Sequence, residues 1–307
     1  SGKINIEVLS SNPYLTRVAN YEIKPGQSIR EKVVPFGLKG TNSVIVEAST
    51  LPALQLERRL NFLIQYPHGC LEQTLSIAFP QLYLKNLVRL TPEQVKEIER
   101  YLRVAVEKMR RFQLPGGGFS YWPGEHESHH WTTTYAGWFL LEASRAGYYV
   151  PGEILAAWKD NQKMLANAWV TGRPEDQLLQ AFRLFALAQA REPDTGAMNR
   201  LREKPGLRSL SSILLAAAFY LNGQVEAAEE LVDRTRLSFD KYRDSALTFG
   251  SELRDKAMIA HCLSLMGQRE KARPLIKEIA EAASSDLWLS TNETAMVLLA
   301  LSTYFGT

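Results

Sequence analysis

The pattern of apolar positions divides the chain into a short first part and a long second part. Residues 3–8 alternate strictly between polar and apolar side chains, and residues 43–48 are likewise rich in β-branched apolar residues, so both stretches are predicted to be strands. From residue 49 onward this alternation gives way to apolar residues three and four positions apart, the spacing of helices. The sequence therefore predicts a β segment over residues 1–48 and a mainly α-helical domain over residues 49–307.

Start and stop signals delimit the helices of the second part. Residues 91–94, Thr-Pro-Glu-Gln, combine a capping residue, a proline suited to the first helical position and a capping-box glutamine, so a helix is expected from 92 to about 112. The other predicted helices are residues 56–64, 72–84, 135–146, 178–190, 212–221, 255–266 and 291–304. Helical hairpins of this kind pack as an open solenoid or as a closed ring, and periodicity alone does not decide between the two.

One turn between two predicted helices carries an unusual combination of reactive groups. In residues 66–73, YPHGCLEQ, Cys70 precedes a helix, where free N–H groups and the macrodipole favour negative charge on sulfur. Residues three apart on a helix share a face, so the sulfur can reach the carboxamide of Gln73. Loss of ammonia from this pair would give an internal thioester, a stored acylating group. A buried apolar cysteine and a protease-type nucleophile are the alternatives for Cys70.

Composition narrows the classes of function without choosing one. Hydrophobic residues make up 45% of the chain and charged residues 22%, as in a globular protein with a full core. The net charge of +3 is too small to indicate nucleic-acid binding. No apolar run is long enough to span a membrane, no signal peptide is present, and we expect the chain to be part of a longer protein. Cys262 and His261 lie in an apolar helix, so they are expected to be structural and no disulfide framework is predicted.

A glycine-rich turn at residues 116–118 introduces a cluster of aromatic residues. The three glycines are not followed by Lys-Ser or Lys-Thr and do not open a helix, so a phosphate-binding loop is not expected. A thioester has to be kept from water, and nearby aromatic side chains are suited to this role, ordinary core packing being the alternative for each. The predicted shielding residues are Tyr66, Phe119, Tyr121, Trp122, Trp131 and Tyr135.

Four histidines lie close to these two regions. His68 is expected to be a turn residue, and His126, His129 and His130 follow the aromatic cluster. The last three, with two neighbouring glutamates, are zinc-type ligands, but their spacing matches no standard zinc site. No metal and no cofactor is therefore predicted. His129 and His130 remain candidates for assisting acyl transfer.

Three stretches together resemble the thioester domain of the α2-macroglobulin/complement C3 family, most closely its bacterial members. They are residues 69–73 (GCLEQ), 79–84 (FPQLYL) and 117–122 (GGFSYW), and the resemblance runs over most of residues 49–307. Leu71 departs from the pattern, because animal members usually carry glycine there, which bears on local packing. The resemblance implies an α/α toroid of helical hairpins and a β segment that belongs to an adjoining CUB-like β-sandwich domain.

The resemblance also implies a protease trap rather than an enzyme. Cleavage of a bait region elsewhere in the parent protein exposes the thioester, an amine of the captured protease attacks the acyl carbon of Gln73, and Cys70 leaves. Glu72 is implied in forming or positioning the bond, and a histidine such as His129 or His130 relays the acyl group in complement-like members. The implied partners are target proteases and other domains of the parent chain, with no nucleic acid and no direct membrane contact. The implied location is the periplasm or the extracellular space, with anchoring of the parent left open.

Two other functions stay open on the residues alone. An α/α-toroid enzyme, such as a glycosidase or terpenoid cyclase, needs paired carboxylates or an Asp-rich metal motif facing into the ring. The sequence contains no Asp-Asp-x-x-Asp run, and its acidic residues are mostly interspersed with Lys and Arg on predicted helix faces. A helical-repeat binding module would carry no covalent chemistry and would leave Cys70 inert.

Overall fold

The structure is a computed structural model, and two compact units make up the chain, residues 1–53 and 54–307. The described residues are 17, 19, 21, 23, 26–37, 40–44, 46, 63–170, 174–239, 248–285 and 289–306. In the first unit, the described residues form neither helix nor strand.

The β segment predicted for residues 1–48 is therefore not seen. The expected strand at 3–8 lies outside the described residues, and residues 43, 44 and 46 of the second expected strand adopt no regular structure. The side chains of Val44 and Val46 are exposed, so their apolar face has no packing partner in the described part of the unit. Isolated strands are not stable without such a partner, which explains why an alternating pattern alone is insufficient here.

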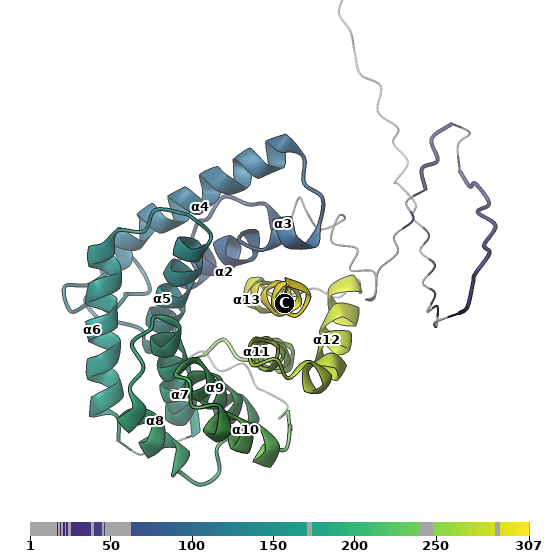
Figure 1. Cartoon of the computed structure of the whole chain (residues 1–307). Coiled ribbons are helices and arrows are strands. Elements are labelled where there is room, and N and C mark those ends of the chain that lie inside the picture. Colours follow the sequence, from purple (N-terminus) through teal and green to yellow (C-terminus); the bar gives the residue numbers. More distant parts are fainter. Residues whose placement is uncertain are drawn as a thin grey trace, which may run out of the picture. The chain divides into compact units, whose positions relative to one another are not determined.

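The second unit is a closed ring of helical hairpins (Figure 1). Its inner helices are α2 (Leu71–Gln81), α5 (His130–Arg145), α7 (Pro174–Gln189), α9 (Ser209–Leu221), α11 (Glu252–Leu265) and α13 (Thr291–Gly306). Its outer helices are α4 (Pro92–Phe112), α6 (Gly152–Ala168), α8 (Thr195–Arg202), α10 (Val225–Arg234) and α12 (Arg269–Ser284), and the short α3 (Leu84–Leu87) follows α2. Each inner helix packs against the next, and α13 packs against α2 to close the ring. The predicted α/α toroid is confirmed.

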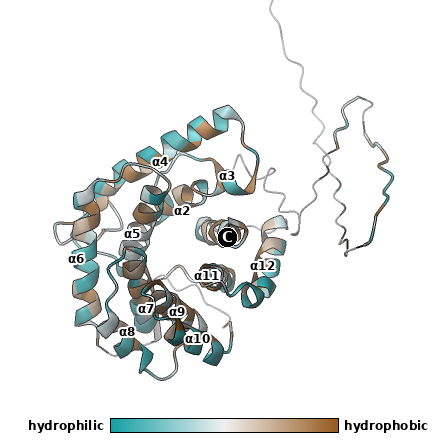
Figure 2. Ribbon diagram, viewed as in Figure 1, coloured by the Kyte–Doolittle hydropathy of each residue, from teal (hydrophilic) through white to brown (hydrophobic). Residues whose placement is uncertain are grey.

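Inner and outer helices differ in where their apolar residues lie. Every residue of α9 from Ser209 to Phe219 is buried, because neighbours enclose this helix on all sides. The outer helix α4 instead has one buried stripe that includes Ile98, Leu102 and Met109, and its other face is charged. Figure 2 shows the same contrast between the apolar α9 and α11 and the polar outer surface of α4 and α6. None of the described helices has the length and hydropathy needed to cross a membrane.

The inner helices run in one direction, because an antiparallel outer helix separates each from the next. At one end, the hydroxyl of Ser251, the N-cap of α11, donates a hydrogen bond of 2.6 Å to Glu293 in the first turn of α13. At the other end, Arg145 of α5 donates a hydrogen bond of 2.5 Å to the carbonyl of Gln189, the last residue of α7. The N-termini of the inner helices therefore gather on one side of the ring, called here the N-terminal face.

Most predicted helices lie close to their expected positions. The signal at Thr91 is confirmed, since its side chain and that of Gln94 form the capping box of α4. Helix α5 begins at His130 rather than residue 135, because the side chain of His129 accepts the N–H of Thr132 and so caps it. The helix predicted at 56–64 lies almost entirely outside the described residues.

Trp158 fixes the outer helix α6 against the inner helix α5. Its side chain is fully buried, and its indole N–H donates a hydrogen bond of 2.9 Å to the carbonyl of Thr133. The indole lies directly on Gly137 of α5, where an added Cβ would be 1.9 Å from Trp158 Cε2. The two helices approach this closely because Gly137 has no side chain.

Gly137→Ala should therefore lower the free energy of unfolding by about 1–3 kcal/mol, as overpacking of a full core does. As a control, Gly152→Ala at the start of α6 meets no atom within 4 Å and should be neutral or stabilising by about 0.4–1 kcal/mol. Urea denaturation measures both. A Gly137→Ala variant as stable as the parent would show that Trp158 can move aside freely.

Candidate functional site

Cys70 is the N-cap residue of α2, as predicted from the sequence. Its backbone is extended, with φ −67° and ψ 174°, and its side chain is 2% exposed. The sulfur accepts a hydrogen bond of 3.5 Å from the backbone N–H of Gln73. In return, Oε1 of Gln73 accepts the backbone N–H of Cys70 at 3.2 Å. This reciprocal capping box turns the Gln73 carboxamide back toward Cys70.

Gly69 provides the space for this arrangement. Its φ of +88° lies in the left-handed region, which side chains other than glycine rarely adopt. A Cβ at this position would lie 2.1 Å from Oε1 of Gln73 and 3.0 Å from its Cδ, so the carboxamide lies across Gly69. The Gln73 side chain is exposed, whereas Cys70 is buried. Gln73 of the pair is therefore exposed to solvent while Cys70 is covered.

The loop that follows α4 covers the sulfur with Tyr121. The carbonyl of Tyr121 accepts a hydrogen bond of 2.9 Å from the backbone N–H of Leu71, which places Tyr121 beside Cys70. The pKa of Tyr121 is raised, first by burial and then by the hydrogen bond to Cys70 and the negative charges of Cys70 and Glu72. The phenol therefore keeps its proton at neutral pH and can donate it in a hydrogen bond to the sulfur.

Two further rings pack against Tyr121. Phe249, from the loop before α11, lies nearly parallel to it, with 6.2 Å between centroids and 9° between planes. His129 lies 5.8 Å from Tyr121 and 6.0 Å from Phe249, so the three rings contact one another pairwise. Sequence reasoning missed Phe249, because it is remote from the motif along the chain. The available signal was Ser251, an N-cap type of residue that marks the start of α11 at the N-terminal face.

Glu72 points along α2 into a buried polar group of side chains. Its Oε1 accepts a hydrogen bond of 2.6 Å from the Ser76 hydroxyl. That hydroxyl lies 3.5 Å from the Tyr135 hydroxyl and accepts the amide of Asn292 at 3.4 Å. Burial raises the pKa of Glu72, and the bond from Ser76 lowers it by a smaller amount. The carboxyl thus joins α2 to α5 and α13 beneath the site.

Three of the predicted shielding residues lie within the packed ring. Phe119 is fully buried, and its backbone N–H donates to the hydroxyl of Thr133 at 2.9 Å. Trp131 is 2% exposed and packs on Phe182, with 4.6 Å between ring centroids. Tyr135 stacks on Phe79 at 5.3 Å. Their rings pack between helices, so any effect on water access is through the packing of α2 and α5.

Two others lie at the surface. Tyr66 is about half exposed and packs on α4, against the edge of Tyr101 and beneath the ammonium of Lys108, 4.5 Å from the ring centroid. Lys108 also donates a hydrogen bond to the carbonyl of Pro67, so α4 holds the turn that precedes Cys70. Trp122 is about half exposed and contacts the edge of the Tyr121 ring.

The histidines near the site differ in their surroundings. His129 is partly buried, its Nδ1 accepts the N–H of Thr132 at 3.4 Å, and its pKa is lowered by burial and then by the charge of His130. His130 is exposed, and its pKa is lowered by partial desolvation and by Arg183. His68 is exposed in the turn. Across the described residues, no three His, Cys, Asp or Glu side chains are arranged to hold a metal ion.

His261 and Cys262 are buried in α11, far along the chain from the site. Nδ1 of His261 lies 2.8 Å from the hydroxyl of Thr303, and burial lowers its pKa to about 3, so the ring is neutral. Cys262 is 1% exposed, and burial raises the pKa of its thiol. Both residues therefore pack as structural residues of the ring.

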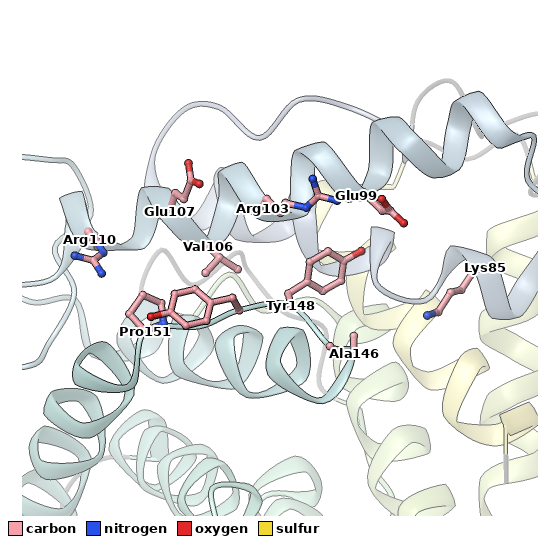
Figure 3. Close-up of a pocket in the computed structure, with 11 residues that line it drawn as sticks. Lys85, Glu99, Arg103, Val106, Glu107, Arg110, Ala146, Tyr148 and Pro151 are labelled. Atoms are coloured by element: carbon pink, nitrogen blue, oxygen red, sulfur yellow. Dashed lines mark hydrogen bonds and ion pairs between the residues drawn. The ribbon is translucent and has the colours of Figure 1, made fainter.

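A cavity of about 530 Å³ lies between α4 and the loop that joins α5 to α6 (Figure 3). Arg103 and Arg110 line it on one side, and Tyr148 and Pro151 on the other. None of the residues that line it is a predicted site residue. It adjoins the C-terminal end of α5, whereas His129 caps the N-terminal end of that helix, so the cavity is separate from the Cys70 site.

Comparison with known proteins agrees with the geometry at α2. A family model described as the A-macroglobulin TED domain matches residues 44–173. The match covers 130 of the 307 residues of the chain. The resemblance to a thioester domain inferred from the sequence is confirmed.

Similar proteins extend the match over most of the chain. The α2-macroglobulin of Escherichia coli (strain K12) is 26% identical over an aligned length of 293, and the alignment covers 87% of this chain and 17% of the relative. The native cryo-EM conformation of E. coli α2-macroglobulin has a TM-score of 0.70 and 24% identity over 82% of this chain and 17% of that chain. A Salmonella α2-macroglobulin reacted with methylamine has a TM-score of 0.70 and 25% identity, with the same coverage of 82% and 17%. The chain thus spans about a sixth of the length of these relatives.

The buried carboxyl of Glu72 predicts a pH dependence of stability. Its folded pKa lies above the unfolded value of about 4.3, so burial costs nothing below that pH and lowers stability as the pH rises through the folded pKa. Glu72→Gln keeps an acceptor for Ser76 without the charge. From pH 4 upward the parent chain should lose stability relative to this variant, as measured by urea midpoints across pH.

Glu192 provides a control, because its contribution to stability changes with pH in the opposite direction. Its pKa is lowered by the hydrogen bond and the charge of Lys163, so its contribution to stability is present above its unfolded pKa and is lost as the pH falls. Glu192→Gln should therefore reduce stability near neutral pH and have no effect at low pH. If the difference in stability between the parent chain and Glu72→Gln does not change with pH, the assignment for Glu72 is wrong.

Proposed function

We propose that Cys70 and Gln73 form an internal thioester, and that the chain is the thioester domain of a bacterial α2-macroglobulin-like protease inhibitor. The observation that carries this proposal is the reciprocal capping box, in which the Cys70 sulfur and the Gln73 carboxamide are held against the same turn of α2. The match of residues 44–173 to the A-macroglobulin TED domain model supports it.

Formation of the bond needs only these two side chains. The sulfur of Cys70 attacks the side-chain carbonyl carbon of Gln73, the new C–S bond replaces the C–N bond, and the thiol proton leaves with nitrogen as ammonia. Capping geometry favours this step, because it holds both groups on one turn before reaction and so removes most of the entropy of bringing them together. Glu72 is part of the proposal as the residue that fixes the first turn through Ser76.

When the bond is used, the sulfur of Cys70, which was the nucleophile in its formation, becomes the leaving group. An amine attacks the acyl carbon of Gln73, an amide forms, the C–S bond breaks, and the proton released by the amine ends on the sulfur of Cys70. The exposure of Gln73 suits this step, because the acceptor is a protein side chain that has to reach the acyl carbon. Each bond reacts once, so the domain is a single-turnover trap rather than an enzyme.

Transfer in this scheme goes directly to an amine. With Nδ1 of His129 accepting the N–H of Thr132, the proton of the neutral ring is on Nε2, and neither nitrogen offers a free lone pair to attack the acyl carbon. His130 is exposed and its pKa responds to Arg183 and Asp176 of α7 rather than to Cys70. Both remain part of the proposal as residues that shape the N-terminal face.

The whole inhibitor extends beyond this chain in the proposal, since the relatives it matches are about six times longer. Target proteases cut a bait segment in another part of the parent protein, which works in the periplasm or outside the cell. Among the similar structures, a Salmonella α2-macroglobulin is described as reacted with methylamine, a small amine of the kind that opens a thioester.

Intact mass tests the bond directly. The chain should weigh one ammonia less than its sequence, and methylamine should add its own mass and release a thiol at Cys70 that reacts with iodoacetamide. Cys70→Ala and Gln73→Ala should each have the mass of their sequences and take up no methylamine. Full sequence mass in the freshly folded parent, with Cys70 already reactive as a thiol, would refute the thioester.

Gly69→Ala provides a second test that leaves both reacting residues in place. Its Cβ would overlap the Gln73 carboxamide, so it should prevent most of the mass deficit. Gly147→Ala is a matched control, because Gly147 has a similar φ of +91° and no atom within 4 Å of an added Cβ. Both variants should lose about 1–2 kcal/mol of stability from backbone strain, but only Gly69→Ala should lose the thioester. Equal mass deficits in the two variants would show that the position of the carboxamide is not decisive.

A further inference from the structure

We propose that the hydroxyl of Tyr121 is the hydrogen-bond donor to the departing Cys70 sulfur, and that Phe249 is the positioning residue that holds Tyr121 there. This inference rests on the proposed thioester. It assigns Tyr121 a part in the reaction in addition to its predicted shielding, and it assigns a function to the loop before α11.

Tyr121 is held at several of its atoms. Its carbonyl accepts the N–H of Leu71, and its own N–H donates to the Glu125 carboxylate at 3.1 Å, which closes the loop behind it. These bonds fix the backbone of Tyr121 beside Leu71, the residue next to Cys70, and the raised pKa of the phenol is consistent with a nearby Cys70 sulfur. The ring itself is held by contact with Phe249 and His129. The position of the hydroxyl therefore depends on backbone bonds from one loop and on a ring from another.

Phe249 keeps this position at a conformational cost. Its φ of +50° lies in the left-handed region, which costs a residue with a side chain more than it costs glycine. A residue under such strain is held by its surroundings, and here Arg254 supplies the restraint. Its guanidinium is fully buried, donates a hydrogen bond of 3.0 Å to the carbonyl of Thr248 and lies 4.7 Å above the Trp131 ring. Helices α11 and α5 thus hold the loop, and the loop presents the Phe249 ring to Tyr121.

The chemistry needs a donor at this point. When the amine attacks, the C–S bond breaks and its electron pair stays on sulfur, which is buried and has lost contact with water. A preorganised donor stabilises such a developing charge without reorganisation. Tyr121 keeps its own proton throughout, and the proton from the amine ends on the sulfur after the bond has broken.

The alternative role for the three rings is that of a simple cover. The two roles predict opposite changes in the rate at which small amines react with the bond. Loss of a cover would speed the reaction of the bond with small amines, whereas loss of a donor or of its support would slow it.

The test measures the rate at which methylamine adds its own mass to the folded 307-residue chain. Tyr121→Phe removes only the hydroxyl and should slow the reaction about ten- to hundredfold, the range expected for one hydrogen bond to a charged group. Phe249→Gly removes the ring from a backbone that glycine adopts without strain, and it should slow the reaction about two- to tenfold, the value of one aromatic contact. Phe249→Tyr keeps a ring and should recover most of the rate that Phe249→Gly loses.

The double variant separates positioning from general structural damage. If Phe249 acts through Tyr121, then Phe249→Gly should add nothing in a Tyr121→Phe background. Tyr149→Ala is the matched control for loss of an aromatic ring, because Tyr149 is 83% exposed beside the separate cavity, and it should react like the parent. Thermal denaturation checks that all variants are folded at the assay temperature.

Each outcome has a distinct meaning. Faster reaction of Phe249→Gly or Tyr121→Phe, or independent effects that multiply in the double variant, overturns this inference and leaves the thioester standing. Absence of the mass deficit in the parent chain overturns the proposed function, and this inference with it.

Discussion

The structure at α2 depends on one short-range constraint, the pair of hydrogen bonds between Cys70 and Gln73. A capping box usually pairs a serine or threonine with a glutamate or glutamine. Sulfur is a weaker acceptor than a hydroxyl, as the 3.5 Å bond shows, so cysteine is a poor choice for helix stability alone. Caps contribute about 1 kcal/mol, a small part of the stability of a ring this size. The residue types are better explained by chemistry: the same geometry that caps the helix holds a nucleophile beside an acyl group.

The ring explains why residues from distant segments can serve this pair. Because the inner helices run in parallel, the loops before α2, α5 and α11 all meet at the N-terminal face. Tyr121 and His129, from the loop before α5, contact Phe249 there, although Phe249 comes from the distant loop before α11. Closure through α13 also brings Asn292 to Ser76 beneath the same turn. The toroid therefore provides a rigid base under α2 and brings two other loops to the start of this helix.

Features set by local sequence were predictable, and features set by tertiary packing were not. The N-cap position of Cys70 and the limits of α4 follow from capping and breaking residues within a few positions. The aromatic cluster after Gly118 could be recognised, but its sequence does not reveal that Phe119 faces the core while Tyr121 faces Cys70. Phe249 could not be assigned at all, because its place depends on ring closure. The β segment was predicted from alternation, which indicates a buried face without supplying the partner that buries it.

The two ends of the proposed bond lie in different surroundings, and this difference is what a covalent trap requires. Cys70 is enclosed by α2, Tyr121 and the rings behind it, whereas the Gln73 side chain is exposed. An acyl group that must be passed to a protein amine has to face outward, since a folded target cannot enter the ring. A leaving sulfur has no such need, and enclosure lets fixed donors replace water around it. If the exposure were reversed, the sulfur would be open to thiol exchange and the acyl carbon closed to its acceptor. In our proposal, covering the acyl side until a protease has been captured is a separate task, and other parts of the parent protein perform it.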